Sequence, residues 1–179
     1  YKKGGGPLFD MGPYYLTALV KLLGPVQEII GYSKATFEKR YVENPEVSYK
    51  EINVDIDTHY FGLLKFNSGI IVDFQFSFDI WKPYDPKLEI YGDETSLKLA
   101  DPNNYDGEIF IFNKDLYQWE LIYSSPDNEN NFYRGLGVIE MVRALKNSKV
   151  SEKELLVPFH ILEVMSALDS YNSDSGWTK

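Results

Sequence analysis

Apolar residues at helical spacing mark the first predicted element of the chain. Four of them recur at intervals of three and four residues, the repeat of one helix face: Leu16, Leu19, Val20 and Leu23. Pro13 suits the first position of a helix, and Gly24 followed by Pro25 ends one. The pattern predicts a helix over residues 13–23.

Strict alternation of side chains replaces the helical repeat in the middle of the chain. In residues 52–61 every second position falls on one face, which would carry Ile52, Val54, Ile56, Thr58 and Tyr60. A turn at 67–69 follows, and residues 70–78 alternate again, with Ile70, Val72, Phe74, Phe76 and Phe78 on one face. These two runs predict a β-hairpin.

Further strands are expected on either side of that hairpin. Residues 26–37 form one candidate directly after the first helix, and residues 87–99 suggest a second hairpin that turns at Gly92 and Asp93. Residues 108–112 and 118–123 add two more strands.

The C-terminal part returns to helical spacing. Val138, Met141, Val142 and Leu145 keep that spacing, and Ser151 with Glu154 forms a possible capping box. Pro158 is then expected near the start of a longer helix that carries Ile161, Val164, Met165 and Leu168. Helix, antiparallel strands and two helices, in that order, predict an α+β fold whose helices cover one face of a sheet.

Composition narrows the classes of function. The 179 residues fit one domain, and 14 Tyr and 11 Phe favour an extensive sheet. A formal net charge of −9 argues against a nucleic-acid partner, and the lack of cysteine excludes disulfides and thiol chemistry. No apolar run approaches the ~18 residues of a membrane span and no signal peptide is visible, so a cytoplasmic protein is expected. The chain starts at Tyr1 without methionine, which suggests a piece of a longer polypeptide.

Asp10 and Tyr14 are the first candidates for chemistry. They lie four residues apart where a glycine run meets the first helix, and the positive end of the helix dipole favours an acid there. A carboxylate and a phenol so placed can bind hydroxyl groups or relay a proton. Spacing alone favours the plainer interpretation, a stabilising N-terminal acid beside a half-buried tyrosine.

Three other patterns give weaker indications of a functional site. Asp55, Asp57 and His59 would share one strand face and could bind a divalent cation, but their spacing is loose, so a solvated polar face is favoured. Residues 135–140 resemble the start of a nucleotide-binding glycine loop but lack its third glycine and its preceding strand, so a helix entrance is expected. His160, on an apolar helix, is expected to be a hydrogen-bonded core histidine.

A set of stretches in fixed order resembles one family over nearly the whole chain. The set comprises residues 4–26, 66–79, 86–103, 134–145 and 159–170. Together they resemble the C-terminal domain of the Gfo/Idh/MocA oxidoreductases, the family of glucose-fructose oxidoreductase and inositol dehydrogenase. The resemblance implies that residues 1–179 are one substrate-binding and oligomerisation domain built on a large, open, mostly antiparallel sheet.

The resemblance also implies roles for residues and partners. The family pattern of three glycines, an apolar pair, Asp, x, Gly, x, His puts its substrate-contacting Asp at Asp10 and its proton-transfer His at Tyr14. An N-terminal Rossmann domain that binds NAD or NADP is missing from this chain, as is the family's Glu-Lys-Pro lysine, which we do not equate with Lys82. The implied function is oxidation or reduction of a sugar or polyol by a homo-oligomer that associates through its sheet. A stand-alone carbohydrate-binding module is the alternative.

Overall fold

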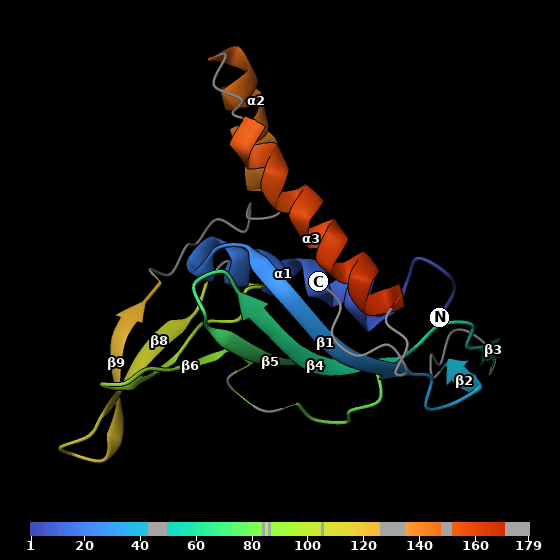
Figure 1. Cartoon of the computed structure of the whole chain (residues 1–179), viewed down its shortest axis with the longest axis horizontal. Coiled ribbons are helices and arrows are strands. Elements are labelled where there is room, and N and C mark those ends of the chain that lie inside the picture. The colour runs from blue at the N-terminus through green and yellow to red at the C-terminus, as the bar shows by residue number, and fades with distance from the viewer. Residues whose placement is uncertain are drawn as a thin grey trace. The chain divides into compact units, whose positions relative to one another are not determined.

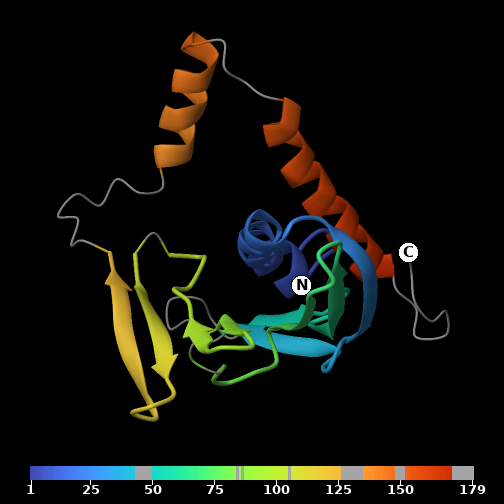
Figure 2. The same ribbon diagram turned by 60° about the vertical axis from the view of Figure 1, so that its left-hand side comes forward.

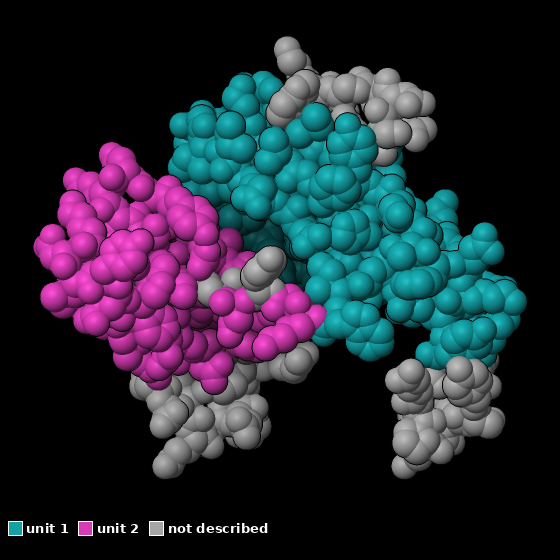
Figure 3. Space-filling view, turned by 90° about the horizontal axis from the view of Figure 1, so that it is seen from below, with its two compact units in different colours: residues 1–81, 152–179 teal, residues 82–151 magenta. Residues whose placement is uncertain are grey.

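The computed structural model describes residues 1–42, 50–83, 85, 87–104, 106–125, 135–147 and 152–170. The chain divides into two compact units, residues 1–81 with 152–179 and residues 82–151. Figure 3 colours these units teal and magenta.

Helix α1 spans Pro7–Leu23 and is longer than the sequence pattern predicted. The predicted start at Pro13 is wrong, because Pro7 takes the first helical position and Pro13 lies inside the helix. Gly24 ends α1 as expected, and its N–H donates to the carbonyl of Val20. The buried side of α1 carries the predicted apolar stripe extended toward the N-terminus: Pro7, Leu8, Gly12, Leu16, Leu19 and Val20.

A three-stranded antiparallel sheet is the centre of the first unit. Its strands are β1 (Val26–Lys34), β4 (His59–Phe66) and β5 (Ile71–Ser77), paired in the order β1-β4-β5. The β4–β5 hairpin was predicted and is confirmed, with Tyr60 opposite Phe76 and Leu64 opposite Val72. Figures 1 and 2 both show α1 and α3 on the same side of this sheet.

The predicted single strand over residues 52–61 is wrong. Strand β3 (Lys50–Asn53) ends after Asn53 and pairs with β2 (Lys39–Val42), whereas β4 begins only at His59. The backbone between them bonds to separate partners: Asp55 N–H donates to the Tyr1 carbonyl and Thr58 N–H to the Lys34 carbonyl. Scattered partners of this kind break a strand ladder although the side chains keep alternating.

Helix α3 (Glu152–Ser170) closes the first unit against α1 and β1. Its buried side chains are those that the helical spacing predicted: Ile161, Val164, Met165 and Leu168. Pro158 lies inside α3 rather than near its start. The predicted capping box falls outside what the structure describes, because Ser151 is not placed and nothing is described of the Glu154 side chain.

The second unit contains a four-stranded antiparallel sheet and helix α2 (Leu136–Lys146). The strands pair in sequence order, and the predicted hairpin about Gly92 and Asp93 is confirmed: β6 (Glu89–Tyr91), β7 (Ser96–Lys98), β8 (Glu108–Asn113) and β9 (Gln118–Ser124). The α+β class is thus confirmed. Its described strands pair in three sheets of three, two and four strands.

Candidate functional site

Asp10 and Tyr14 lie one turn apart on the side of α1 that faces away from the core. Tyr14 is 44% exposed and Asp10 is exposed. Lys21, two turns after Tyr14, is exposed as well. Thr17, half-buried, lies on the same side. We call Asp10, Tyr14, Thr17 and Lys21 the α1 stripe. It presents a carboxylate, a phenol and an ammonium group from one rigid helix.

The glycine run gives the chain the backbone conformation that starts this helix. Gly4 and Gly6 have φ of 85° and 96°, a region that side chains with a Cβ rarely adopt. The Asp10 N–H donates to the Gly6 carbonyl at 2.9 Å, so Asp10 lies within the first turn. There the unpaired N–H groups of the helix start favour a carboxylate.

Both candidate side chains are available to a ligand as far as the structure describes the chain. No hydrogen bond or ion pair joins the Asp10 carboxylate or the Tyr14 hydroxyl to another described residue. A carboxylate accepts hydrogen bonds only, whereas a phenol hydroxyl can donate and accept. The pair can therefore hold two neighbouring hydroxyl groups or pass one proton. Because both side chains point into solvent, a facing surface must complete any enclosed site.

The second candidate set does not share one strand face. Asp55 and Asp57 lie between β3 and β4, and only His59 belongs to a strand. Asp55 forms an ion pair with Lys2, Asp57 accepts a hydrogen bond from the Ser33 hydroxyl, and His59 Nδ1 lies 2.8 Å from Ser77 Oγ. In the described part of the chain, no three His, Asp or Glu side chains are placed to hold a metal ion.

His160 is hydrogen-bonded, as the sequence predicted, but its side chain is half-buried rather than part of the core. Its Nε2 accepts a hydrogen bond from the N–H of Val26, the first residue of β1, at 2.9 Å. The imidazole thus joins α3 to the start of the sheet. Residues 135–140 also behave as predicted, because Gly135 is the N-cap of α2.

Sequence reasoning missed a buried polar cluster at one end of the sheet. Thr58 is 1% exposed and donates from Oγ1 to Asp79 Oδ2 at 2.7 Å, while Arg40 forms an ion pair with the same carboxylate. Burial by itself would raise the pKa of Asp79. Hydrogen bonds from Thr36 and Thr58 and the charge of Arg40 outweigh it and hold the pKa below its ordinary value.

A second contact, between a buried tyrosine and an exposed aspartate, fixes the end of α3. The Tyr60 hydroxyl donates to Asp169 Oδ1 at 2.8 Å. Burial, together with the hydrogen bond and charge of Asp169, raises the pKa of the Tyr60 phenol far above its ordinary value. Tyr60 therefore stays a neutral donor, and it serves packing rather than proton transfer. For both contacts, the only signal in the sequence was a side chain with a hydroxyl group, Thr58 or Tyr60, in the alternating run of residues 52–61.

The chain is similar to known proteins both in sequence and in fold. A family model described as the GFO/IDH/MocA C-terminal domain matches residues 1–98. No curated protein gives a significant match. Among the described residues, no helix is both long enough and apolar enough to cross a bilayer.

Three solved structures resemble the fold. An oxidoreductase domain protein from Kribbella flavida aligns with a TM-score of 0.70 at 19% identity, over 99% of this chain and 50% of that chain. An NAD binding oxidoreductase from Klebsiella pneumoniae has a TM-score of 0.66 at 19% identity, over 98% and 51%. An oxidoreductase from Bacillus cereus has a TM-score of 0.59 at 15% identity, over 100% and 53%. This chain spans about half the length of each.

Proposed function

The chain belongs to the GFO/IDH/MocA C-terminal domain family, and from that premise we propose that it is the substrate-facing domain of a cytoplasmic NAD(P)-dependent oxidoreductase. The proposed substrate class is a sugar or polyol. The missing partner is an N-terminal Rossmann domain, and residues 1–179 together serve substrate binding and oligomerisation.

The α1 stripe is the observation that carries this proposal. The family match includes all of α1. The family pattern in the sequence would put the substrate-contacting residue at Asp10 and the proton-transfer residue at Tyr14. Both side chains point away from the domain's own core and have no described partner. A substrate held against this helix would meet a rigid carboxylate acceptor and a phenol.

The two side chains would have separate roles in the reaction at one alcohol carbon. Oxidation of an alcohol removes a hydride from carbon and a proton from oxygen. The nicotinamide cofactor, when bound, would supply the hydride acceptor. Asp10 would accept a hydrogen bond from a neighbouring substrate hydroxyl and orient the reacting carbon. Tyr14 would take or relay the hydroxyl proton, which its phenol can do where imidazole stands in the family pattern.

We propose that the cofactor is bound outside this chain. One similar structure is an NAD binding oxidoreductase that is about twice as long as the aligned region. In residues 135–140 the glycines begin α2 and no third glycine follows. We therefore expect the chain alone to show no affinity for NAD or NADP.

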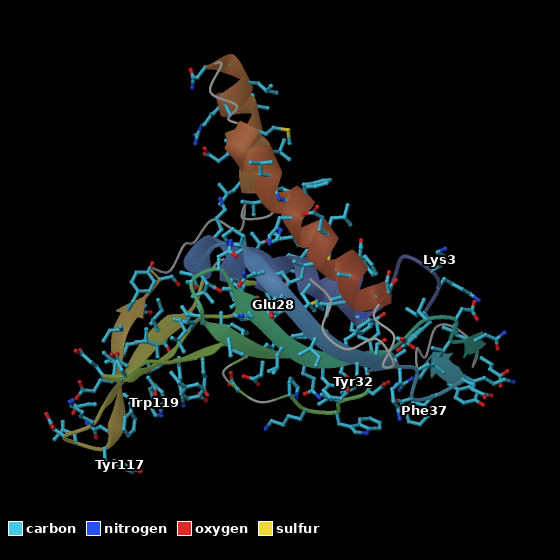
Figure 4. All side chains as sticks on the ribbon, in the orientation of Figure 1. Lys3, Glu28, Tyr32, Phe37, Tyr117 and Trp119 are labelled. Atoms are coloured by element: carbon cyan, nitrogen blue, oxygen red, sulfur yellow. The ribbon has the colours of Figure 1, made fainter. Side chains whose placement is uncertain are left out.

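The side of the sheet opposite α1 and α3 is the proposed interface between copies. Four partly exposed apolar residues lie on it: Tyr32, Phe61, Leu63 and Ile71. The Tyr32 and Phe61 rings are stacked, with centroids 5.5 Å apart. Figure 4 shows Tyr32 on the side of β1 away from the helices. We call these four residues the open face, and propose a second copy as its occupant.

Two measurements test the proposal. Calorimetric titration of the chain with NAD and NADP should give no heat of binding, whereas micromolar affinity would contradict it. The reading frame that encodes Tyr1 should also encode a dinucleotide-binding segment before it, and the full-length protein should reduce NAD(P) in the presence of a polyol or sugar. A chain that binds free sugars tightly by itself, without any such segment, would instead favour the carbohydrate-binding module.

A further inference from the structure

We propose that residues 55–58 form a positioning element that sets where the α1 stripe stands. This inference rests on the proposed function, because it assigns the element a role toward the substrate. None of these four residues is part of the α1 stripe itself. Contacts lead from the sheet, through this segment, to the first turn of α1.

The segment is itself held firmly to the sheet. Thr58 donates its N–H to the Lys34 carbonyl at 3.0 Å, and its own carbonyl accepts the N–H of Phe78 at 2.9 Å. Its hydroxyl is bound to Asp79, as described above. The Ser33 hydroxyl donates to Asp57. Residues 55–58 are therefore tied to the ends of both edge strands, β1 and β5.

The same segment holds the residues that lead into α1. The Asp55 N–H donates to the Tyr1 carbonyl at 3.0 Å, and the Asp55 carboxylate pairs with Lys2. The Gly5 N–H donates back to the Lys2 carbonyl at 2.9 Å, which closes a turn. Residues 1–6 are thus a fixed arm and not a loose linker.

Gly6 is where the segment meets the helix. Gly6 is buried, and a Cβ added to it would lie 2.8 Å from Ile56 Cδ1 and 3.3 Å from the Asp57 carbonyl oxygen. The Gly6 carbonyl accepts the Asp10 N–H, so any shift at Gly6 passes directly to Asp10. The Asp57 carbonyl belongs to backbone that is tied to the sheet and has little freedom to move, so a side chain at Gly6 displaces the start of the helix.

Gly4 supplies a matched control for the contact. Gly4 has a similar positive φ, 85° against 96°, but nothing lies within 4 Å of its Cβ position. Gly4→Ala therefore introduces backbone strain alone, whereas Gly6→Ala adds the clash with Ile56. Ile56→Val removes Cδ1, the clashing atom, so the double variant Gly6→Ala with Ile56→Val should behave like Gly4→Ala.

The experiment uses two readouts. In this chain, hydrogen exchange of the Asp10 amide should be about tenfold faster in Gly6→Ala than in Gly4→Ala, and the double variant should restore it. In the full-length enzyme, Gly6→Ala should lower kcat/KM by about 10²-fold, Gly4→Ala by much less, and Ile56→Val should rescue most of the loss. The loss should appear mainly in kcat, because the substrate still binds but is misplaced.

The outcomes separate this inference from the proposed function. Equal amide exchange in Gly6→Ala and Gly4→Ala overturns the inference whatever the enzyme does. Changed exchange with unchanged kcat/KM in an active enzyme also overturns it, since α1 would then move without consequence for the substrate. A full-length protein without oxidoreductase activity overturns the proposed function and with it the substrate role, while the exchange data still decide whether residues 55–58 position α1.

Discussion

Asp10 and Tyr14 differ in what a substitution can reveal, although they lie on one helix face. The Asp10 carboxylate can only accept, so its proposed part is to hold and orient a hydroxyl. The Tyr14 hydroxyl can donate and accept, so it can hold a hydroxyl or move a proton. Because both are exposed, neither substitution removes core packing. Losses of activity can therefore be interpreted as losses of contact with substrate.

Asp10→Asn in the full-length enzyme should lower kcat/KM by about one to two decades. The reason is that a hydrogen bond to a charged acceptor contributes about 1.5–3 kcal/mol. Cofactor affinity should stay nearly unchanged. Steady-state kinetics and thermal melting check this together. If kcat/KM is unchanged and the melting temperature falls, Asp10 only stabilises the start of α1.

Tyr14→Phe keeps the ring and removes only the hydroxyl. If Tyr14 transfers the proton, as we propose, kcat should fall by about 10²–10⁴-fold. A loss of about tenfold would leave Tyr14 as a hydroxyl contact, since one neutral hydrogen bond contributes about 0.5–1.5 kcal/mol. Lys21→Met, on the same stripe, is the control. It should leave kcat within a few-fold of the parent enzyme, because Lys21 is about three turns from Asp10.

Two glycines face each other where strands β1 and β4 pair. Gly31 lies opposite Gly62 in the register, and a Cβ on Gly62 would lie 2.0 Å from the Ile30 carbonyl oxygen. No side chain fits there without moving the backbone. On the Gly31 side, Leu168 of α3 fills the space, with Cδ2 3.2 Å from the Cβ position. The glycine pair lets the helix lie close against the sheet.

Gly62→Ala should therefore destabilise the chain by about 3 kcal/mol, at the upper end for overpacked sites. Urea unfolding followed by circular dichroism measures this. Gly137→Ala, in α2 where nothing lies within 4 Å of the Cβ position, is the matched control and should not destabilise. Equal stability of the two variants would contradict the close approach of β1 and β4.

The Asp79 cluster joins β2 and the two edge strands, and it gives the fold a dependence on pH. A carboxyl group whose pKa is lower in the folded than in the unfolded chain stabilises above the unfolded value of about 4. That stabilisation is lost as the pH falls through the folded pKa.

Asp79→Asn should cost about 1–3 kcal/mol at neutral pH, because Arg40 and Thr58 lose a charged acceptor. As the pH falls below the ordinary pKa of a carboxyl group, the gap to the wild-type chain should narrow, because the native carboxyl becomes protonated in turn. Urea unfolding across this range checks both statements. Asp73→Asn, exposed on β5, should change little at either pH.

Side-chain alternation predicts which face a residue occupies but not where a strand is interrupted. The β4–β5 hairpin was predictable because its turn signal and alternation are local. The break after Asn53 was not, because the bonds that cause it go to Tyr1 and Lys34, which are far away in the sequence. The early start of α1 likewise depends on Gly6 meeting Ile56. Asp10 and Tyr14 were candidates from their position at the start of the helix, and the family pattern added a role for each. Thr58 was marked only as a polar residue in an alternating run, and Asp79 gave no local signal.

The two proposed contact surfaces of the first unit lie on opposite sides of its sheet. The α1 stripe belongs to the helical layer, and the open face lies across the sheet from it (Figure 1). A second copy on the open face would therefore leave the α1 stripe free for substrate. Both proposals can hold in one molecule.

Light scattering at high micromolar concentration should therefore give at least a dimer. Phe61→Ser should shift the mass toward a monomer, because it removes one ring of the stacked pair at the centre of the open face. Leu22→Ser, which alters an exposed residue of α1, should leave the mass unchanged. A wild-type chain that stays monomeric would contradict the proposed interface.

The first unit has a consequence for synthesis, because it is assembled from both ends of the chain. Residues 82–151, seventy in all, leave the ribosome after the sheet and before α3. At about 5–20 residues per second, α3 follows only after several seconds. During that interval Gly31 lacks the cover of Leu168, and the Val26 N–H lacks its acceptor on His160. The nascent chain is then at its most vulnerable to aggregation, and a slow ribosome lengthens the risk.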